Sequence, residues 1–70
     1  MQEYISNEVN SLRIKMNITQ EELGYKLQVS RQTIIAIEKG NYTPSVLLAL
    51  KIARFFKLPV EYIFKISYEK

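Results

Sequence analysis

Residues 19–40 (TQEELGYKLQVSRQTIIAIEKG) constrain the fold of this chain more than any other stretch. Thr19 and Glu22 have the spacing of a capping box at the start of a helix, and Ser30 is a favourable N-cap for a second helix. Apolar residues follow each start signal at helical spacing; they are Leu23 and Leu27, then Ile34 and Ile37. The stretch therefore predicts two short helices joined by a tight turn.

The second of these helices carries polar side chains in its first turn, and its periodicity leaves them exposed. Such a helix, preceded by another helix and a tight turn, has the geometry that docks into the major groove of DNA. Arginine can bridge guanine O6 and N7, and glutamine can bridge adenine N6 and N7. We therefore expect Arg31 and Gln32 to contact bases; the alternative is an ordinary polar surface.

Thr33 and Ile35, further along the same helix, are weaker candidates for base contact. The Thr33 hydroxyl can donate to a phosphate or touch a thymine methyl group, but it can equally close the cap of its own helix. An exposed Ile35 fits a thymine methyl group, and otherwise packs against the preceding helix. Both alternatives stay open for each residue.

The composition argues against most catalytic chemistry. The chain has 70 residues, which is enough for one domain, and it contains neither histidine nor cysteine. The commonest general base, the commonest metal ligand and every thiolate site are therefore missing. We expect no catalytic residue, no metal, no cofactor and no small-molecule ligand.

The formal net charge is +3, and it is unevenly distributed. Residues 1–40 hold five basic and five acidic side chains, which cancel, whereas residues 41–70 hold five basic and two acidic ones. A polyanionic partner is compatible with this balance, but specificity must come from a few placed groups. Neither a membrane span of roughly 20 apolar residues nor a signal peptide is recognisable, so we expect a cytoplasmic protein without a membrane partner.

Start and stop signals outline the rest of one domain over residues 1–70. We expect helices over residues 8–16, 20–27, 31–39, 44–56 and 60–64, and terminal strands over residues 2–6 and 64–69 that pair in an antiparallel sheet. The expected core stripe is Val9, Leu12 and Met16 in the first helix and Val46, Ala49, Ile52, Ala53 and Phe56 in the fourth. The fourth helix is apolar nearly all round, which predicts cover on more than one side.

These parts, in this order, resemble the Cro/CI-like (Xre) family of helix-turn-helix regulators over residues 7–64. The matching positions are Arg13, Thr19-Gln20-Glu21-Glu22-Leu23, Val29-Ser30-Arg31-Gln32-Thr33-Ile34, Ile37-Glu38-Lys39-Gly40, Thr43-Pro44-Ser45 and Lys51-Ile52-Ala53. The strand-like ends also resemble the short cytolysin-repressor-like subgroup. The resemblance implies a mostly α-helical, five-helix lambda-repressor-like bundle that binds double-stranded operator DNA as a homodimer, with its third helix in the major groove.

A further set of residues is expected to contact DNA phosphates: Gln20, Ser30, Lys39, Asn41, Tyr42 and Thr43. Gln20 begins a helix, where backbone amides and the helix dipole favour an anion, and the resemblance implies that this glutamine also braces the recognition helix. Donors in the loop after the third helix can hold phosphates without reading sequence. The alternative for each is a solvated loop or helix end.

The resemblance also implies that Arg13 and Glu38 form a structural ion pair, so that Arg13→Ala should damage folding more than DNA affinity. Candidates for the subunit interface are Leu47, Phe55, Tyr62, Phe64 and Tyr68, unless some of them complete the monomer core.

Two positions depart from the family pattern. Gly24 replaces the common alanine and should weaken its helix by roughly 1 kcal/mol. Gln28 stands where the turn often has glycine, which leaves the turn conformation open.

The function indicated is a sequence-specific transcriptional regulator, a repressor acting on a near-palindromic operator. The alternative is a protein-interaction module, such as an antitoxin-like or anti-regulator protein, which the apolar surplus of the fourth helix favours weakly. An enzyme is the least supported class, because no carboxylate pair or glycine-rich phosphate loop stands out.

Overall fold

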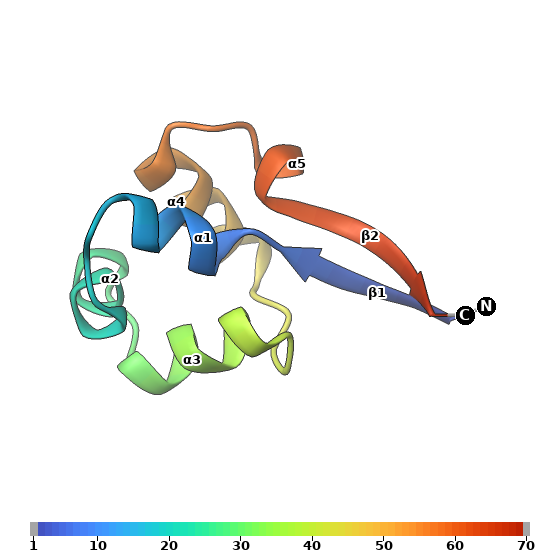
Figure 1. The fold of residues 1–70 in the computed structure, drawn as a ribbon, viewed down its shortest axis with the longest axis horizontal. Helices are drawn as coiled ribbons and strands as arrows, with labels where there is room; N and C mark the ends of the chain where they lie inside the picture. Colours follow the sequence, from blue (N-terminus) through green and yellow to red (C-terminus); the bar gives the residue numbers. More distant parts are fainter. Residues whose placement is uncertain (1, 70) are drawn as a thin grey trace.

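The computed structural model describes residues 2–69, in which five helices are flanked by two terminal strands (Figure 1). In chain order the elements are β1 (Gln2–Asn7), α1 (Val9–Lys15), α2 (Gln20–Leu27), α3 (Arg31–Lys39), α4 (Val46–Phe56), α5 (Val60–Ile63) and β2 (Phe64–Glu69). The expected helical bundle with a terminal sheet is confirmed. Met1 and Lys70, which belong to the expected domain, lie outside the described residues.

The predicted caps hold α2 and α3 at the expected bounds. Thr19 Oγ1 accepts a hydrogen bond from the Glu22 amide at 3.0 Å, and the Glu22 carboxylate accepts one from the Thr19 amide at 2.8 Å. Ser30 Oγ accepts from the Thr33 amide at 3.1 Å. Helices α1, α4 and α5 are shorter than expected. Helix α1 spans Val9–Lys15, α4 begins at Val46 after its N-cap Ser45, and the backbone is already extended at Phe64.

Four helices end at a residue with positive φ, as helix C-termini often do. Gly40 takes this role after α3, with φ of 80°. Asn17, Gln28 and Lys57 take it after α1, α2 and α4, with φ of 60°, 64° and 59°. Gln28 thus adopts the left-handed conformation itself, and the turn between α2 and α3 keeps its shape without a glycine.

Gly24 is required by the packing of that turn, which corrects its interpretation as a simple weakness of α2. A Cβ at this position would lie 2.9 Å from the Val29 carbonyl oxygen and 3.3 Å from that of Ser30. The Val29 amide also donates to the Gly24 carbonyl at 2.9 Å. Close approach of the turn to α2 therefore outweighs the helix propensity that an alanine would add.

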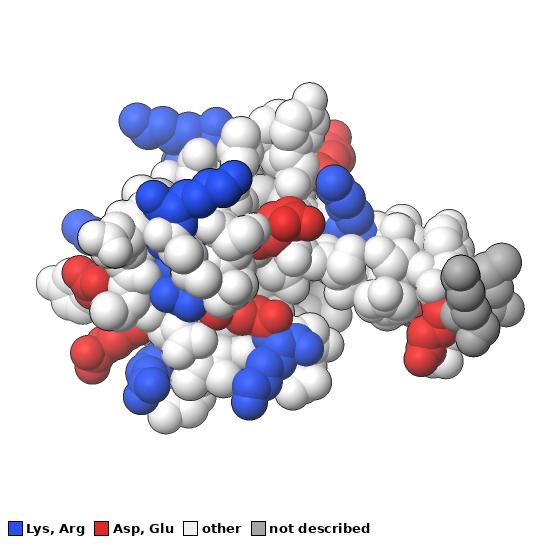
Figure 2. Space-filling view, in the orientation of Figure 1, with Lys and Arg blue, Asp and Glu red and all other residues white. Residues whose placement is uncertain are grey.

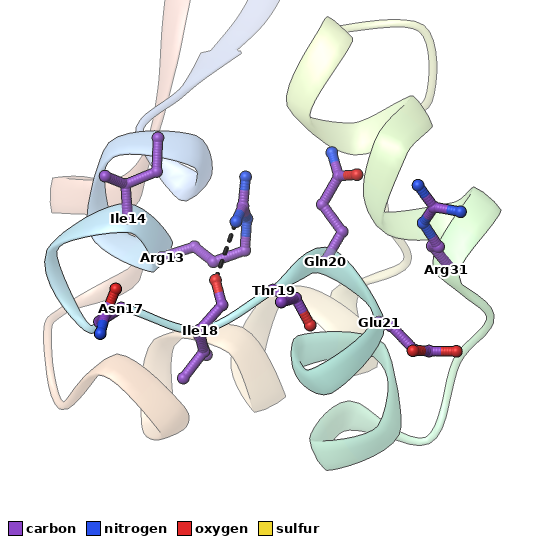
Figure 3. A pocket seen from close by; sticks show the side chains of 8 residues that line it. All are labelled: Arg13, Ile14, Asn17, Ile18, Thr19, Gln20, Glu21 and Arg31. Carbon is purple, nitrogen blue, oxygen red and sulfur yellow. Dashed lines mark hydrogen bonds between the residues drawn. The ribbon is translucent and has the colours of Figure 1, made fainter.

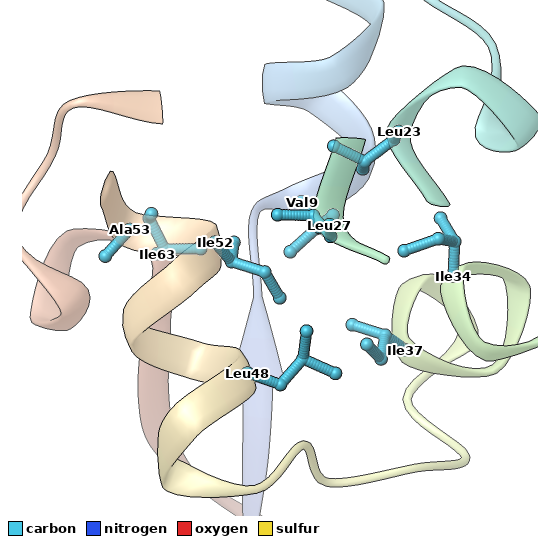
Figure 4. Packing of buried hydrophobic residues seen from close by; sticks show 9 residues of the cluster. All are labelled: Val9, Leu23, Leu27, Ile34, Ile37, Leu48, Ile52, Ala53 and Ile63. Atoms are coloured by element: carbon cyan, nitrogen blue, oxygen red, sulfur yellow. The ribbon is translucent and has the colours of Figure 1, made fainter. Parts of the chain in front are cut away.

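The core lies where α1–α5 converge (Figure 4). Its fully or nearly fully buried members are Val9, Leu23, Leu27, Ile34, Ile37, Leu48, Ile52, Ala53 and Ile63. Two residues were wrongly predicted to face the core: Met16 is 48% exposed and Val46 is 78% exposed. Since α4 begins with Ser45 as its N-cap, the inward positions fall on Leu48 and Ile52 rather than on the first residue of the helix.

Strands β1 and β2 pair antiparallel and project from the bundle as a two-stranded ribbon (Figure 1). Ile5 pairs with Ile66 in the ribbon, and the hydroxyls of Ser6 and Ser67 are 2.7 Å apart. The Glu8 amide donates to the Ile63 carbonyl at 2.9 Å, which ties the base of the ribbon to α5. Within residues 2–69, every helix is too short or too polar to cross a lipid bilayer.

Candidate nucleic-acid interface

Helix α3 is held on one side by the core and lies at the edge of the bundle (Figure 1). Ile34 and Ile37 are completely buried, and they fix the rotation of the helix about its axis. At its C-terminal end, Asn7 Nδ2 donates to the Ile37 carbonyl at 2.9 Å, while Asn7 Oδ1 accepts from the Val9 amide. One side chain thus connects β1, α1 and α3, so the outer face of α3 is presented by a fixed scaffold.

The outer face of α3 begins with Arg31 and Gln32, and both side chains are exposed. Ile35 follows about one turn later and is half-buried, as is Ala36. The structure therefore brings three of the candidate base-reading residues, Arg31, Gln32 and Ile35, onto one face. The polar end of that face can form the bidentate contacts by which arginine and glutamine recognise base edges.

Thr33 and Ser30 are engaged with each other at the start of α3. Their hydroxyl oxygens are 3.0 Å apart, and the Ser30 hydroxyl oxygen also accepts from the Thr33 amide. Thr33 is half-buried, whereas Ser30 is exposed. The cap-closing alternative for Thr33 is thus realised, but a hydroxyl can still offer one further contact because it is both donor and acceptor.

Four polar side chains on the α1 flank of α3 form what we call the Glu38 cluster: Asn10, Arg13, Gln20 and Glu38. Arg13 Nε donates to Glu38 Oε2 at 2.6 Å, and the two side chains are only 12% and 5% exposed. Asn10 and Gln20 donate to Glu38 Oε1 at 3.0 and 3.1 Å. Arg13 also donates to the Ile18 carbonyl at 2.9 Å. The cluster locks α1 and the start of α2 to the C-terminal half of α3.

The Glu38 carboxyl is ionised more easily than an ordinary glutamate. Burial opposes its ionisation, but hydrogen bonds from Arg13, Asn10 and Gln20 outweigh burial and hold its pKa below the usual value. The pKa of Glu22 is also lowered, chiefly by the hydrogen bond from the Thr19 amide. Both carboxylates therefore accept structural hydrogen bonds, Glu38 within its cluster and Glu22 in the capping box of α2.

A hollow of about 580 Å³ opens beside the Glu38 cluster, between the α1–α2 segment and the start of α3 (Figure 3). Its polar lining is Arg13, Asn17, Thr19, Gln20, Glu21 and Arg31. Figure 3 shows Gln20 between Arg13 and Arg31, with its side-chain amide directed toward α3. Gln20 thus lies at the start of α2 as expected, and its side chain braces α3 through Glu38.

The remaining phosphate candidates lie at and beyond the C-terminal end of α3. Lys39 and the loop residues Asn41, Tyr42 and Thr43 are all exposed. The Asn41 amide donates to the Ala36 carbonyl at 2.9 Å, so the loop leaves α3 in a fixed direction. These side chains carry donors at the C-terminal end of α3. Ser30 lies at the other end of α3 as its N-cap, and Gln20 begins α2.

The candidate interface residues divide into two groups. Leu47, Tyr62 and Tyr68 are 70%, 65% and 56% exposed. Phe55 and Phe64 are half-buried and pack against the core, which is the alternative left open for them. Two further apolar residues on α4, Val46 and Leu50, are 78% and 54% exposed beside Leu47 and were not predicted as interface candidates. Their shared helical spacing was the signal that could have identified them.

On the face shown in Figure 2, charged side chains are dispersed rather than gathered into one patch. Figure 2 shows basic side chains separated by acidic ones on the visible face, with acidic side chains toward the far end of the ribbon. In residues 2–69 we find no group of acidic side chains that could hold a metal ion. The visible face therefore presents no broad basic patch.

Comparison with known proteins agrees with this geometry. The helix-turn-helix family model matches residues 9–63. An HTH-type transcriptional regulator of Methanocaldococcus jannaschii is 57% identical over 60 residues, covering 86% of this chain and 91% of that protein. A second such regulator, from Bacillus subtilis, is 46% identical over 65 residues, covering 93% and 98%.

Two further similarities concern proteins with described roles. The CTXphi transcriptional repressor RstR of Vibrio cholerae is 31% identical over 55 residues, which are 79% of this chain and 50% of that protein. The crystal structure of the restriction-modification controller protein C.AhdI from Aeromonas hydrophila has the same fold, with a TM-score of 0.69, 22% identity and coverage of 77% and 78%. From its buried, capped α2–α3 unit and these relatives, the chain belongs to the Xre-type helix-turn-helix family of transcriptional regulators.

Proposed function

We propose that this protein is a sequence-specific repressor that binds a near-palindromic operator as a homodimer, with α3 in the major groove. The observation that carries the proposal is the orientation of α3. Ile34 and Ile37 are completely buried, so Arg31 and Gln32 are held outward at the start of the helix. A rigidly held helix with arginine and glutamine in its first turn suits direct reading of base edges.

Backbone contacts would position this helix on the duplex. We assign them to the start of α2, the cap of α3 and the loop beyond α3: Gln20, Ser30, Lys39, Asn41, Tyr42 and Thr43. These residues surround α3 and supply amide, hydroxyl and ammonium donors, which suit phosphate oxygens. Thr33 and Ile35 add contacts within the groove, where each can meet a thymine methyl group.

Two considerations support the proposed homodimer. A single helix reads only a few base pairs, and dimers of this motif place two recognition helices about 34 Å apart. On α4, Val46, Leu47 and Leu50 form an exposed apolar face, which a second copy would cover. We therefore assign the subunit interface to this face, with Tyr62 and Tyr68 as further candidates. Leu47→Lys should yield a monomer in light scattering, and an unchanged dimer would contradict the assignment.

Repression would act by occupancy of the operator, and it requires no chemistry on the DNA. We place the protein in the cytoplasm, where it would meet its operator. The similarity to a phage repressor supports repression over activation. A reporter gene under the bound operator tests the sign of regulation, because its expression should rise when the regulator is removed.

Titration of the ¹⁵N-labelled protein with short duplex DNA tests the proposal directly. Resonances of residues 30–36 and 41–43 should shift, together with that of Gln20, while the α1 core positions should not. No shift in α3 would refute the proposal. Repression that survives Arg31→Ala combined with Gln32→Ala would instead favour a protein-interaction module.

A further inference from the structure

The flank of α3 that faces α4 contains a second polar hollow, of about 330 Å³, which we call the Lys51 hollow. It lies between the α2–α3 turn, the first half of α3, and the segment leading into α4. Its polar lining is Gln28, Thr33, Tyr42, Ser45 and Lys51, and its apolar lining is Val29, Leu47 and Leu48. Residues far apart in the sequence thus converge beside the proposed recognition helix.

The linings of the two hollows have the same formal charge, +1, but only the lining on the α1 flank contains a carboxylate. Lys51 is the ionisable cation of its lining, and no carboxylate lines it among residues 2–69. The hollow beside the Glu38 cluster, in contrast, includes Glu21 with Arg13 and Arg31. A positive charge among neutral hydrogen-bonding groups favours an anion.

Donors in the Lys51 hollow remain available. Lys51 Nζ donates to Gln28 Oε1 at 3.2 Å, which uses one of the three N–H groups of the ammonium. Ser45 Oγ accepts from the Leu48 amide at 3.1 Å, so its hydroxyl hydrogen can still donate. The Tyr42 side chain is 47% exposed and carries a third donor.

We propose that the Lys51 hollow binds a backbone phosphate of the DNA, on the strand opposite the one contacted by Gln20. A helix in the major groove has a phosphate backbone on each side, and the two hollows lie on opposite flanks of α3. Lys51 supplies the charge, and Tyr42 and Ser45 donate to the phosphate oxygens. This inference rests on the proposed function and adds Lys51 and Ser45 to its backbone contacts.

The test is the salt dependence of DNA binding, followed by fluorescence anisotropy of a labelled duplex. Each phosphate contact contributes about 0.9 to the slope of log K against log salt concentration. Lys51→Met, which keeps the aliphatic stem, should lower the slope by about 0.9 and weaken binding about tenfold for all sequences alike. The exposed Lys65 of β2 provides the control, since Lys65→Met should leave the slope unchanged.

Two further variants separate a phosphate contact from a structural tie between α2 and α4. Lys51→Arg keeps the charge and should keep the slope. Gln28→Gly removes the partner of Lys51 but not its charge, and should also keep the slope. If Gln28→Gly reproduces the loss seen with Lys51→Met, Lys51 acts through the fold and the inference fails. Should Lys51→Met unfold, Lys51→Gln gives the same slope measurement.

The remaining outcomes distinguish this inference from the function on which it rests. DNA binding by the wild type with an unaltered slope in Lys51→Met overturns the inference alone. Absence of any DNA binding by the wild type overturns both. Titration with inorganic phosphate should not saturate the Thr33 and Ser45 resonances below millimolar concentration; submillimolar saturation would show a site for a free anion and refute the DNA assignment.

Discussion

The two flanks of α3 carry similar polar residues but use them differently. On the α1 flank, Arg13, Asn10 and Gln20 direct their donors to Glu38, and the ion pair at the centre is almost completely buried. On the α4 flank, the Lys51 ammonium has one neutral partner and keeps other donors available. The Glu38 cluster therefore fixes α3 in place, whereas the Lys51 hollow keeps hydrogen-bond donors that a partner can use.

The largest expected effect tests the structural role of the α1 flank. Arg13→Ala leaves the Glu38 carboxylate buried without its cation, so the free energy of unfolding should fall by about 3–5 kcal/mol. Urea unfolding followed by circular dichroism measures this change. A double variant, Arg13→Leu with Glu38→Leu, should recover most of the stability because no charge is then stranded. A loss below 1 kcal/mol in Arg13→Ala would remove the distinction between the flanks.

The next effect concerns the turn from which α3 starts. Gly24→Ala places a methyl group 2.9 Å from the Val29 carbonyl oxygen, and should destabilise the protein by about 1–3 kcal/mol despite better helix propensity. The thermal unfolding midpoint is the readout. A matched change on the exposed surface of α2, Tyr25→Ala, should have little effect. A rise in the midpoint for Gly24→Ala would contradict the close approach.

Acid should weaken the α1 flank. The pKa of Glu38 is lower in the folded state than in the unfolded state. Its ionised carboxylate therefore stabilises the fold above the unfolded-state pKa of about 4.3, and this stability is lost as the pH falls through the lower, folded-state value. The free energy of unfolding should therefore decrease from pH 5 downward. Glu38→Gln should flatten this dependence. An equal acid sensitivity in both proteins would assign the effect to other groups.

The smallest effect lies on the α4 flank. Gln28 holds a φ of 64°, which a side-chain-bearing residue adopts with strain and glycine does not. Gln28→Gly should raise the free energy of unfolding by up to about 1 kcal/mol, even though its contact with Lys51 is lost. Calorimetry detects a change of this size as a higher unfolding midpoint. A clear destabilisation would mean that the Lys51 tie contributes more than the backbone strain.

Local signals in the sequence were sufficient to predict the α2–α3 unit. Thr19, Glu22 and Ser30 are cap residues whose hydrogen bonds reach only three positions along the chain, and all of these bonds are present. The inward face of α4 was harder to predict, because an almost entirely apolar helix has no alternation of apolar and polar residues to mark its buried side. Its rotation is set by its neighbours, which bury Leu48 and expose Val46.

Contacts between distant segments explain what else the sequence could not show. The need for Gly24 arises from the carbonyl of Val29 after the chain has turned back, and the family pattern alone suggested a weakness. Asn10 reaches Glu38 from another helix, and no local motif marks it. The exposure of Arg31 and Gln32 could be predicted from helical periodicity, because Ile34 and Ile37 clearly mark the buried side of α3.

Reading of base sequence by the α3 face that carries Arg31 and Gln32 is the property on which the proposed function depends. Selection of bound duplexes from a random pool, performed with the wild type and with Gln32→Ala, tests it most directly. The wild type should enrich an inverted repeat whose half-sites are about 34 Å apart, and Gln32→Ala should lose preference at one position of each half-site, a difference of about 1–3 kcal/mol. An identical motif from both proteins, or no motif from the wild type, would contradict the claim.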